Sequence, residues 1–201
     1  MTVSGLWPEP ADPAIPSGGP PVFNPGNLMQ VRAEWVDFFD AHYHRVVRFL
    51  MHNGASLADA QDAAQEAFIE SFQLMSQSPE RWAAVTGKPT WIRTVALRRY
   101  RRPPGPRRRP LTVGDAIPDR PALGPGHDEL TVQAHLVLQA LQALDEEARA
   151  VMAFDLDGIP AADTAGALGV TQQRVRDIRK KARTVLKQEL ARQAEPGRRQ
   201  L

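Results

Sequence analysis

Residues 158–187 read GIPAADTAGALGVTQQRVRDIRKKARTVLK, and this stretch decides the fold of the C-terminal half of the chain. Pro160 suits the first turn of a helix, and Gly169 should end that helix just after Leu168. Thr171 can then cap a longer helix. A short helix, a turn of a few residues containing glycine, and a longer helix together predict a helix-turn-helix.

The longer helix has an apolar face and a basic one. Val175, Ile178, Ala182 and Leu186 recur at helical spacing and are expected to point inward. The opposite face and its flanks comprise Gln173, Asp177, Lys180, Thr184, Arg176, Lys181 and Lys187. A solvated helix usually mixes acids with its bases, whereas residues 171–187 hold seven bases and one acid. Because Arg, Lys and Gln can bind base edges, we expect DNA binding, with RNA binding or a solvated helix as alternatives.

Proline divides the rest of the chain. Of 18 prolines, seven lie in residues 8–25 and seven in residues 103–125. Proline fixes φ and removes a backbone donor, so neither stretch can form a long helix or a central strand. We interpret residues 1–27 as a disordered tail and residues 103–128 as a flexible linker rich in proline and arginine. The sequence therefore predicts an all-α protein with two small domains, 28–102 and 129–192, followed by a tail at 193–201.

Helical spacing places elements in both domains. Helices are expected over 28–52, from 57 onward, and over 89–102 in the first domain, and over 130–144 and 146–156 in the second. Asn53-Gly54 should end the first helix, and Ser56 with Asp59 forms a capping box for the next. Three further sets of residues should point inward: Val31, Trp35, Phe38, His42, Val46 and Phe49; Leu57, Ala60, Ala64, Ala67, Phe68 and Met75; and Val132, Leu136, Ala140, Leu141, Leu144, Ala148, Val151, Met152 and Leu156.

Charge is segregated along the first domain. Residues 53–80 hold five acids and no base, whereas residues 88–114 hold nine bases and no acid. On the second helix, Asp59, Asp62, Glu66 and Glu70 surround Ile69 on the face opposite the apolar one. An apolar residue inside an acidic face indicates a docking surface for a basic partner, with a solvated acidic face as the alternative.

Other classes of protein are disfavoured. The chain has no cysteine, which excludes disulfides and fits a cytoplasmic location. It has no apolar run of membrane-spanning length and no secretion signal. His42 and His44 diverge on their helix and cannot easily share a metal, and no phosphate loop or nucleophile motif is present. We therefore expect no enzymatic activity, no metal and no cofactor.

Both domains together resemble the extracytoplasmic-function branch of bacterial sigma factors. In the first domain the resemblance rests on FFDAHYHRVVRFL, DAQDAAQEAFIESF and WIRTVALRR, and in the second on most of residues 141–190. The resemblance covers about 140 residues. It implies an all-helical protein that binds core RNA polymerase and directs it to promoters. The chain departs from the family after Trp91, where Arg98 and RRYRR replace the usual Asn and Asp.

The resemblance also implies roles for individual residues. By this resemblance, the residues that would dock on the clamp helices of the largest polymerase subunit are Asp59, Asp62, Gln65 and Glu66, to which we add Ile69. The segment around Trp91, with Arg93, Arg98 and Arg99, would meet the melted upstream promoter element. The second domain would read the minus-thirty-five element through Arg176, Asp177, Lys180 and Lys181, with Thr171, Gln172, Gln173, Arg174 and Arg179 beside them. We expect Arg174 and Arg179 to contact phosphates.

Three rivals stay open. A helix-turn-helix regulator that does not act as a sigma factor would explain residues 130–190 but would leave the acidic first domain without a task. An adaptor or anti-sigma protein would not need the basic helices. An enzyme lacks a recognisable site. Whether the chain itself has an anti-sigma partner is not determined by the sequence.

Overall fold

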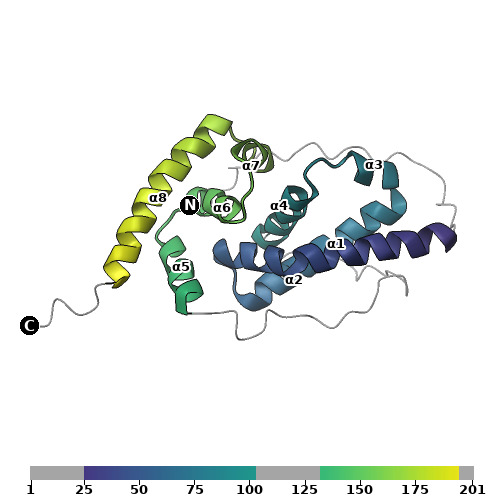
Figure 1. Cartoon of the computed structure of the whole chain (residues 1–201), viewed down its shortest axis with the longest axis horizontal. Helices are drawn as coiled ribbons and strands as arrows, with labels where there is room; N and C mark the ends of the chain where they lie inside the picture. The colour runs from purple at the N-terminus through teal and green to yellow at the C-terminus, as the bar shows by residue number, and fades with distance from the viewer. Residues whose placement is uncertain (1–24, 103–131, 195–201) are drawn as a thin grey trace, which may run out of the picture.

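The computed structural model describes residues 25–102 and 132–194, and within these ranges it contains eight α-helices and no strand (Figure 1). The helices are α1 (Pro25–His52), α2 (Leu57–Gln77), α3 (Pro79–Ala84), α4 (Lys88–Arg101), α5 (Val132–Gln142), α6 (Glu146–Leu156), α7 (Ala161–Leu168) and α8 (Gln172–Ala194). The predicted all-α class is confirmed. The predicted tails and linker lie almost wholly outside the described residues.

Helices α1 to α4 form what we call the N-terminal unit. The apolar stripe of α1 packs on α2, and α4 lies against both helices. Trp35 illustrates the join, since its indole Nε1 donates to the Phe68 carbonyl at 3.1 Å and to Ser71 Oγ at 3.0 Å. Its ring also contacts Phe39 of α1 and meets Phe72 of α2 edge-on, with centroids 5.2 and 5.6 Å away. Beside this group, Phe38 meets Trp82 of α3 edge-on with centroids 5.1 Å apart.

The turn between α1 and α2 follows the sequence closely. Gly54 has φ of 94°, a left-handed value that favours glycine, and it ends α1 as predicted. Ser56 Oγ accepts from the Asp59 N–H at 3.1 Å and donates to the Asp59 carboxylate at 2.6 Å. The cap is thus half of the predicted box, because the Asp59 carboxylate binds the Ser56 hydroxyl instead of reaching back to the backbone. The short helix α3 was not predicted.

Helices α5 to α8 form the C-terminal unit. Asp145 caps α6 by accepting from the Ala148 N–H at 2.7 Å. A small cluster of Leu141, Leu144, Met152 and Ala182 joins α5, α6 and α8. One predicted inward residue is wrong: Leu156 is 48% exposed, because α6 ends at this residue and the helical spacing that predicted its burial stops there. The predicted inward side chain of Val132 lies outside the described residues.

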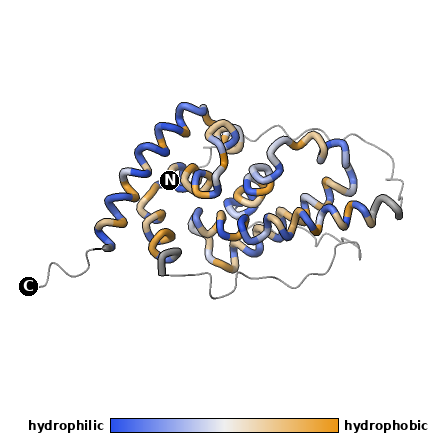
Figure 2. The backbone as a smooth tube through the Cα atoms, in the orientation of Figure 1, coloured by the Kyte–Doolittle hydropathy of each residue, from blue (hydrophilic) through white to orange (hydrophobic). Residues whose placement is uncertain are grey.

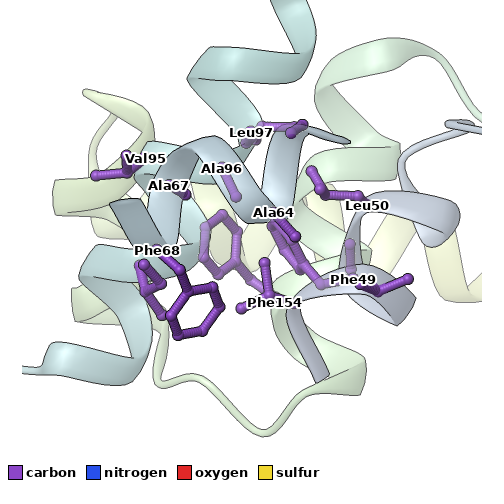
Figure 3. Packing of buried hydrophobic residues seen from close by; sticks show 14 of the residues in the cluster. Phe49, Leu50, Ala64, Ala67, Phe68, Val95, Ala96, Leu97 and Phe154 are labelled. Atoms are coloured by element: carbon purple, nitrogen blue, oxygen red, sulfur yellow. The ribbon is translucent and has the colours of Figure 1, made fainter. Parts of the chain in front are cut away.

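The two units lie against each other and share one core. Phe49 of α1 and Phe154 of α6 are both fully buried, with ring centroids 4.7 Å apart (Figure 3). The main hydrophobic cluster continues from the N-terminal helices through Ala150 and Phe154 to Leu168 and Val175. The sequence predicted two domains on a tether, and it contained no sign of this contact.

The polar residues follow the outside of this arrangement. In Figure 2, α8 is largely hydrophilic along its length, whereas α6 and the middle of α1 carry more apolar residues. No helix in the described ranges is long and apolar enough to cross a membrane.

Candidate nucleic-acid and partner-binding surfaces

The helix-turn-helix is built by α7, a turn at residues 169–171, and α8. Pro160 is the residue before α7, and the Thr164 N–H and hydroxyl both donate to its carbonyl at 2.9 Å. Gly169 adopts φ of 67° at the end of α7, where a side chain would be strained. Thr171 then caps α8, since its Oγ1 accepts from the Arg174 N–H at 3.1 Å. The predicted cap and turn are confirmed.

The outer face of α8 carries cations that are not used by the fold. Arg176, Lys180 and Lys181 are exposed, and none of them forms an ion pair with another described residue. Gln172 and Gln173 are also exposed, and Gln173 Nε2 donates to Asp177 Oδ1 at 3.0 Å, one turn further along. On the inner face Val175, Ile178 and Ala182 are buried, as predicted.

Arg179 differs from its neighbours on α8. Its side chain is only 15% exposed, and its Nη1 lies 3.2 Å from Asp155 Oδ1. Its Nη2 donates to the Ile159 carbonyl at 2.8 Å and lies 3.3 Å from Thr164 Oγ1. Arg179 therefore fastens α8 to the end of α6 and to the start of α7. The prediction that it faces DNA phosphates is corrected, because its guanidinium is turned into the fold.

Arg174 is exposed, but it is already paired with an acid of α6. Its guanidinium binds the Glu147 carboxylate through two contacts of 2.7 and 3.3 Å. The hydrogen bond to Glu147, reinforced by the negative charge of that carboxylate, raises the pKa of Arg174 above its usual value. A phosphate at this position would have to compete with Glu147.

The acidic surface on α2 is present as predicted. Asp59, Asp62, Gln65 and Glu66 are exposed on one side of the helix, and Ile69 is half-buried next to them. Asp62 and Glu66 form no ion pair with another described residue, whereas Glu70 is bound by Arg99 of α4. Two carboxylates and an apolar side chain are therefore free to meet a basic partner.

The four α4 residues that were predicted to meet promoter DNA do not form one exposed surface. Trp91 is half-buried and meets Trp82 of α3 edge-on, with centroids 5.6 Å apart. Arg98 is exposed, and Arg99 binds Glu70. Arg93 is 2% exposed, and its Nε lies 2.6 Å from Asp157 of the C-terminal unit. The prediction that Arg93 lies on a DNA-facing surface is corrected for this arrangement of the two units.

Sequence reasoning missed the acidic partners of these arginines. Asp155, Asp157 and Glu147 are distant in sequence from the residues that they bind on α4 and α8, so no local spacing reveals the pairs. Within the described ranges, no three His, Asp or Glu side chains are grouped to hold a metal ion. No protein-family model matches the chain, and a search of curated proteins returns no match.

Proposed function

We propose that the chain is a sigma factor that binds core RNA polymerase and directs sequence-specific promoter recognition in the cytoplasm. The observation that carries the proposal is the pairing of two unlike surfaces on one small helical molecule. One is the outer face of α8, where Arg176, Lys180 and Lys181 are exposed and form no ion pair within the described part of the chain. The other is the acidic surface on α2, where Asp62 and Glu66 lie near Ile69 and likewise form no ion pair with a described residue.

The α8 surface supports DNA recognition by its position and its chemistry. It is the second helix of a helix-turn-helix, which is the element that enters the major groove in proteins of this type. Arg and Lys donate to guanine O6 and N7, and Gln can pair with adenine. In the same proposal, Arg98 and Trp91 of α4 contact the melted upstream element.

The α2 surface supports a protein partner rather than DNA. Carboxylates repel phosphates, and a half-buried isoleucine among them favours a protein surface with basic and apolar groups. In the proposed function that surface is the clamp helices of the largest polymerase subunit.

Reconstitution with core RNA polymerase tests the proposal. The purified protein should bind core polymerase, and the complex should start transcription at discrete sites on genomic DNA. Glu66→Lys should weaken core binding without unfolding the protein, because Glu66 is exposed. Glu80→Lys is the matched control, since Glu80 is an exposed acid on α3, outside the α2 surface.

The alternative is a helix-turn-helix regulator that binds DNA without polymerase. This alternative predicts that the isolated protein binds DNA tightly and specifically. It also predicts that Glu66→Lys binds polymerase no differently from wild type. That pair of results would replace the sigma factor proposal.

A further inference from the structure

Ion pairs cross the boundary between the two units, and in the described pairs the cation always comes from the same unit. Arginines of the N-terminal unit face acids of the C-terminal unit in each described ion pair that crosses it. Arg93 Nε lies 2.6 Å from Asp157 Oδ2, and Arg48 Nη2 lies 3.4 Å from Asp157 Oδ1. Arg101 Nε lies 2.9 Å from Glu146 Oε1 at the other end of α6. Asp157, the residue after α6, thus binds arginines from two different helices.

The central pair is buried on both sides. The side chains of Arg93 and Asp157 are 3% and 1% exposed, and Arg93 Nη1 also donates to the Pro89 carbonyl at 2.7 Å. An ion pair in such a place has little net effect on stability while both partners are present, because desolvation offsets the attraction. Removing one partner leaves an uncompensated buried charge. Contact between the units should therefore depend strongly on Asp157.

Two buried polar atoms at the end of α1 lie near the same boundary. Neither His52 Nδ1 nor Asn53 Oδ1 has a hydrogen-bond partner among the described residues. This end of α1 abuts α6, since a Cβ at Gly54 would come within 2.9 Å of Arg149 Nη1. Water could satisfy both atoms if the units moved apart, so part of the cost of exposing Phe49 and Phe154 would be recovered.

Each unit has packing of its own that separation would leave in place. In the N-terminal unit α1, α2 and α4 contact one another, and Trp35 is hydrogen-bonded within that unit. In the C-terminal unit the cluster of Leu141, Leu144, Met152 and Ala182 has no buried member from the other unit. Along the chain, residues 102–131 connect α4 to α5.

We propose that the boundary is a reversible closure held by Asp157, and that opening it exposes Arg93 on α4 while both units stay folded. In the closed arrangement Asp157 masks a cation that would otherwise be available to a polyanion. The closure is independent of the proposed function, because it concerns only the contact between the two units.

A distance measurement on the full chain tests the closure. Ala83 of α3 and Ala162 of α7 are exposed, one in each unit, and the chain has no native cysteine. Nitroxide labels on Ala83→Cys and Ala162→Cys should show one dominant, narrowly distributed distance in an otherwise wild-type background. Asp157→Asn should shift the closed-to-open ratio by roughly a hundredfold and yield a longer, broader distance distribution. Helix content, measured by circular dichroism, should not change.

Two matched controls separate closure from general stability. Asp155→Asn removes an acid two positions away that pairs with Arg179 and Arg183 inside the C-terminal unit, so the distance should stay as in the wild-type background. Arg93→Gln should open the molecule from the other side of the pair, whereas Arg99→Gln, which removes a pair within the N-terminal unit, should not. An unchanged distance in Asp157→Asn and Arg93→Gln would overturn the proposal. So would a loss of helix that accompanies the longer distance, because the units would then be inseparable.

Discussion

Single arginines on α8 have different tasks although they lie within six positions of one another. Arg176 is exposed and forms no ion pair with the residues that the structure describes, Arg174 is exposed and bound to Glu147, and Arg179 is turned inward. The sequence set Arg176 apart from the other two as a base-reading residue, but it gave Arg174 and Arg179 the same expected role at phosphates. Their partners, which come from α6 and from the loop before α7, distinguish them.

The first prediction distinguishes an arginine that stabilises the fold from an exposed lysine that is available for binding. Arg179→Ala removes contacts to Asp155 and to the Ile159 carbonyl, and should lower the free energy of unfolding by about 2 kcal/mol. Lys180→Ala, one position away and exposed, should change it by less than about 0.5 kcal/mol. Urea denaturation of both variants is the measurement. Equal stability of the two would show that Arg179 does not fasten α8.

The second prediction concerns base recognition in the proposed function. Arg176→Ala should change which upstream elements are used, at a cost of about 1–3 kcal/mol at one position. Arg174→Ala should lower output on all promoters by a smaller factor, because Glu147 competes for this guanidinium. Transcription from a library of randomised upstream elements reports both. A shifted consensus with Arg174→Ala alone would mean that a different face of α8 meets the DNA.

A third prediction follows from His52. Burial lowers the pKa of His52 below 6.5, although Asp157 opposes the shift. The unfolded chain therefore binds this proton at a higher pH than the folded protein does, so stability should fall as the pH drops below about 6.5. His42 shifts in the same direction, again chiefly through burial. Thermal melts from about pH 7.5 to about pH 5.5 should show a smaller decline in His52→Gln than in wild type. Parallel curves for the two proteins would show that His52 does not cause the loss of stability at low pH.

At the scale of elements, capping decides where helices begin. Ser56 and Ser78 both precede helices of the N-terminal unit, yet only the side chain of Ser56 accepts a hydrogen bond from the helix that follows it. The start of α2 matters for the proposed docking surface, because Asp59 lies in its first turn.

The fourth prediction uses this pair of serines. Ser56→Ala should lower the free energy of unfolding by about 1 kcal/mol, the usual effect of removing an N-cap. Ser78→Ala should have a smaller effect, because its side chain caps nothing in α3. Chemical denaturation of both variants provides the comparison, and a larger loss at Ser78 would contradict the assigned caps.

At the scale of the whole molecule, the closed arrangement has a consequence for DNA binding. The isolated protein should bind DNA weakly, because Arg93 is buried against Asp157 and the two units cannot take independent positions. Core polymerase, or another partner that binds the open form better, would shift the population toward it.

The fifth prediction tests that consequence. Asp157→Asn should bind DNA more tightly than wild type in the absence of polymerase, and the salt dependence should steepen by about one unit if Arg93 reaches a phosphate. Fluorescence anisotropy at several salt concentrations measures both quantities, with Asp155→Asn as the control. If Asp157→Asn opens without any gain in affinity, Arg93 has no role in DNA binding, and the closure itself still stands.

The order and register of most helices follow from the sequence alone. Apolar spacing at Trp35, Phe49, Val151 and Val175 predicted which faces are buried, and local caps such as Thr171 predicted where helices begin. These signals are short-range, since helical periodicity and capping involve residues only a few positions apart. The exposed faces of α2 and α8 were predictable for the same reason.

Only the tertiary structure decided which charged residues belong to the fold and how the two units meet. Arg93 and Asp157 are 64 positions apart, and Phe49 and Phe154 are further apart still. Nothing local distinguishes Arg93 from Arg98, yet the first is buried and the second exposed. The physical reason is that a buried charge requires a specific partner at hydrogen-bonding distance, and that partner is supplied by the folded chain rather than by its neighbours in sequence.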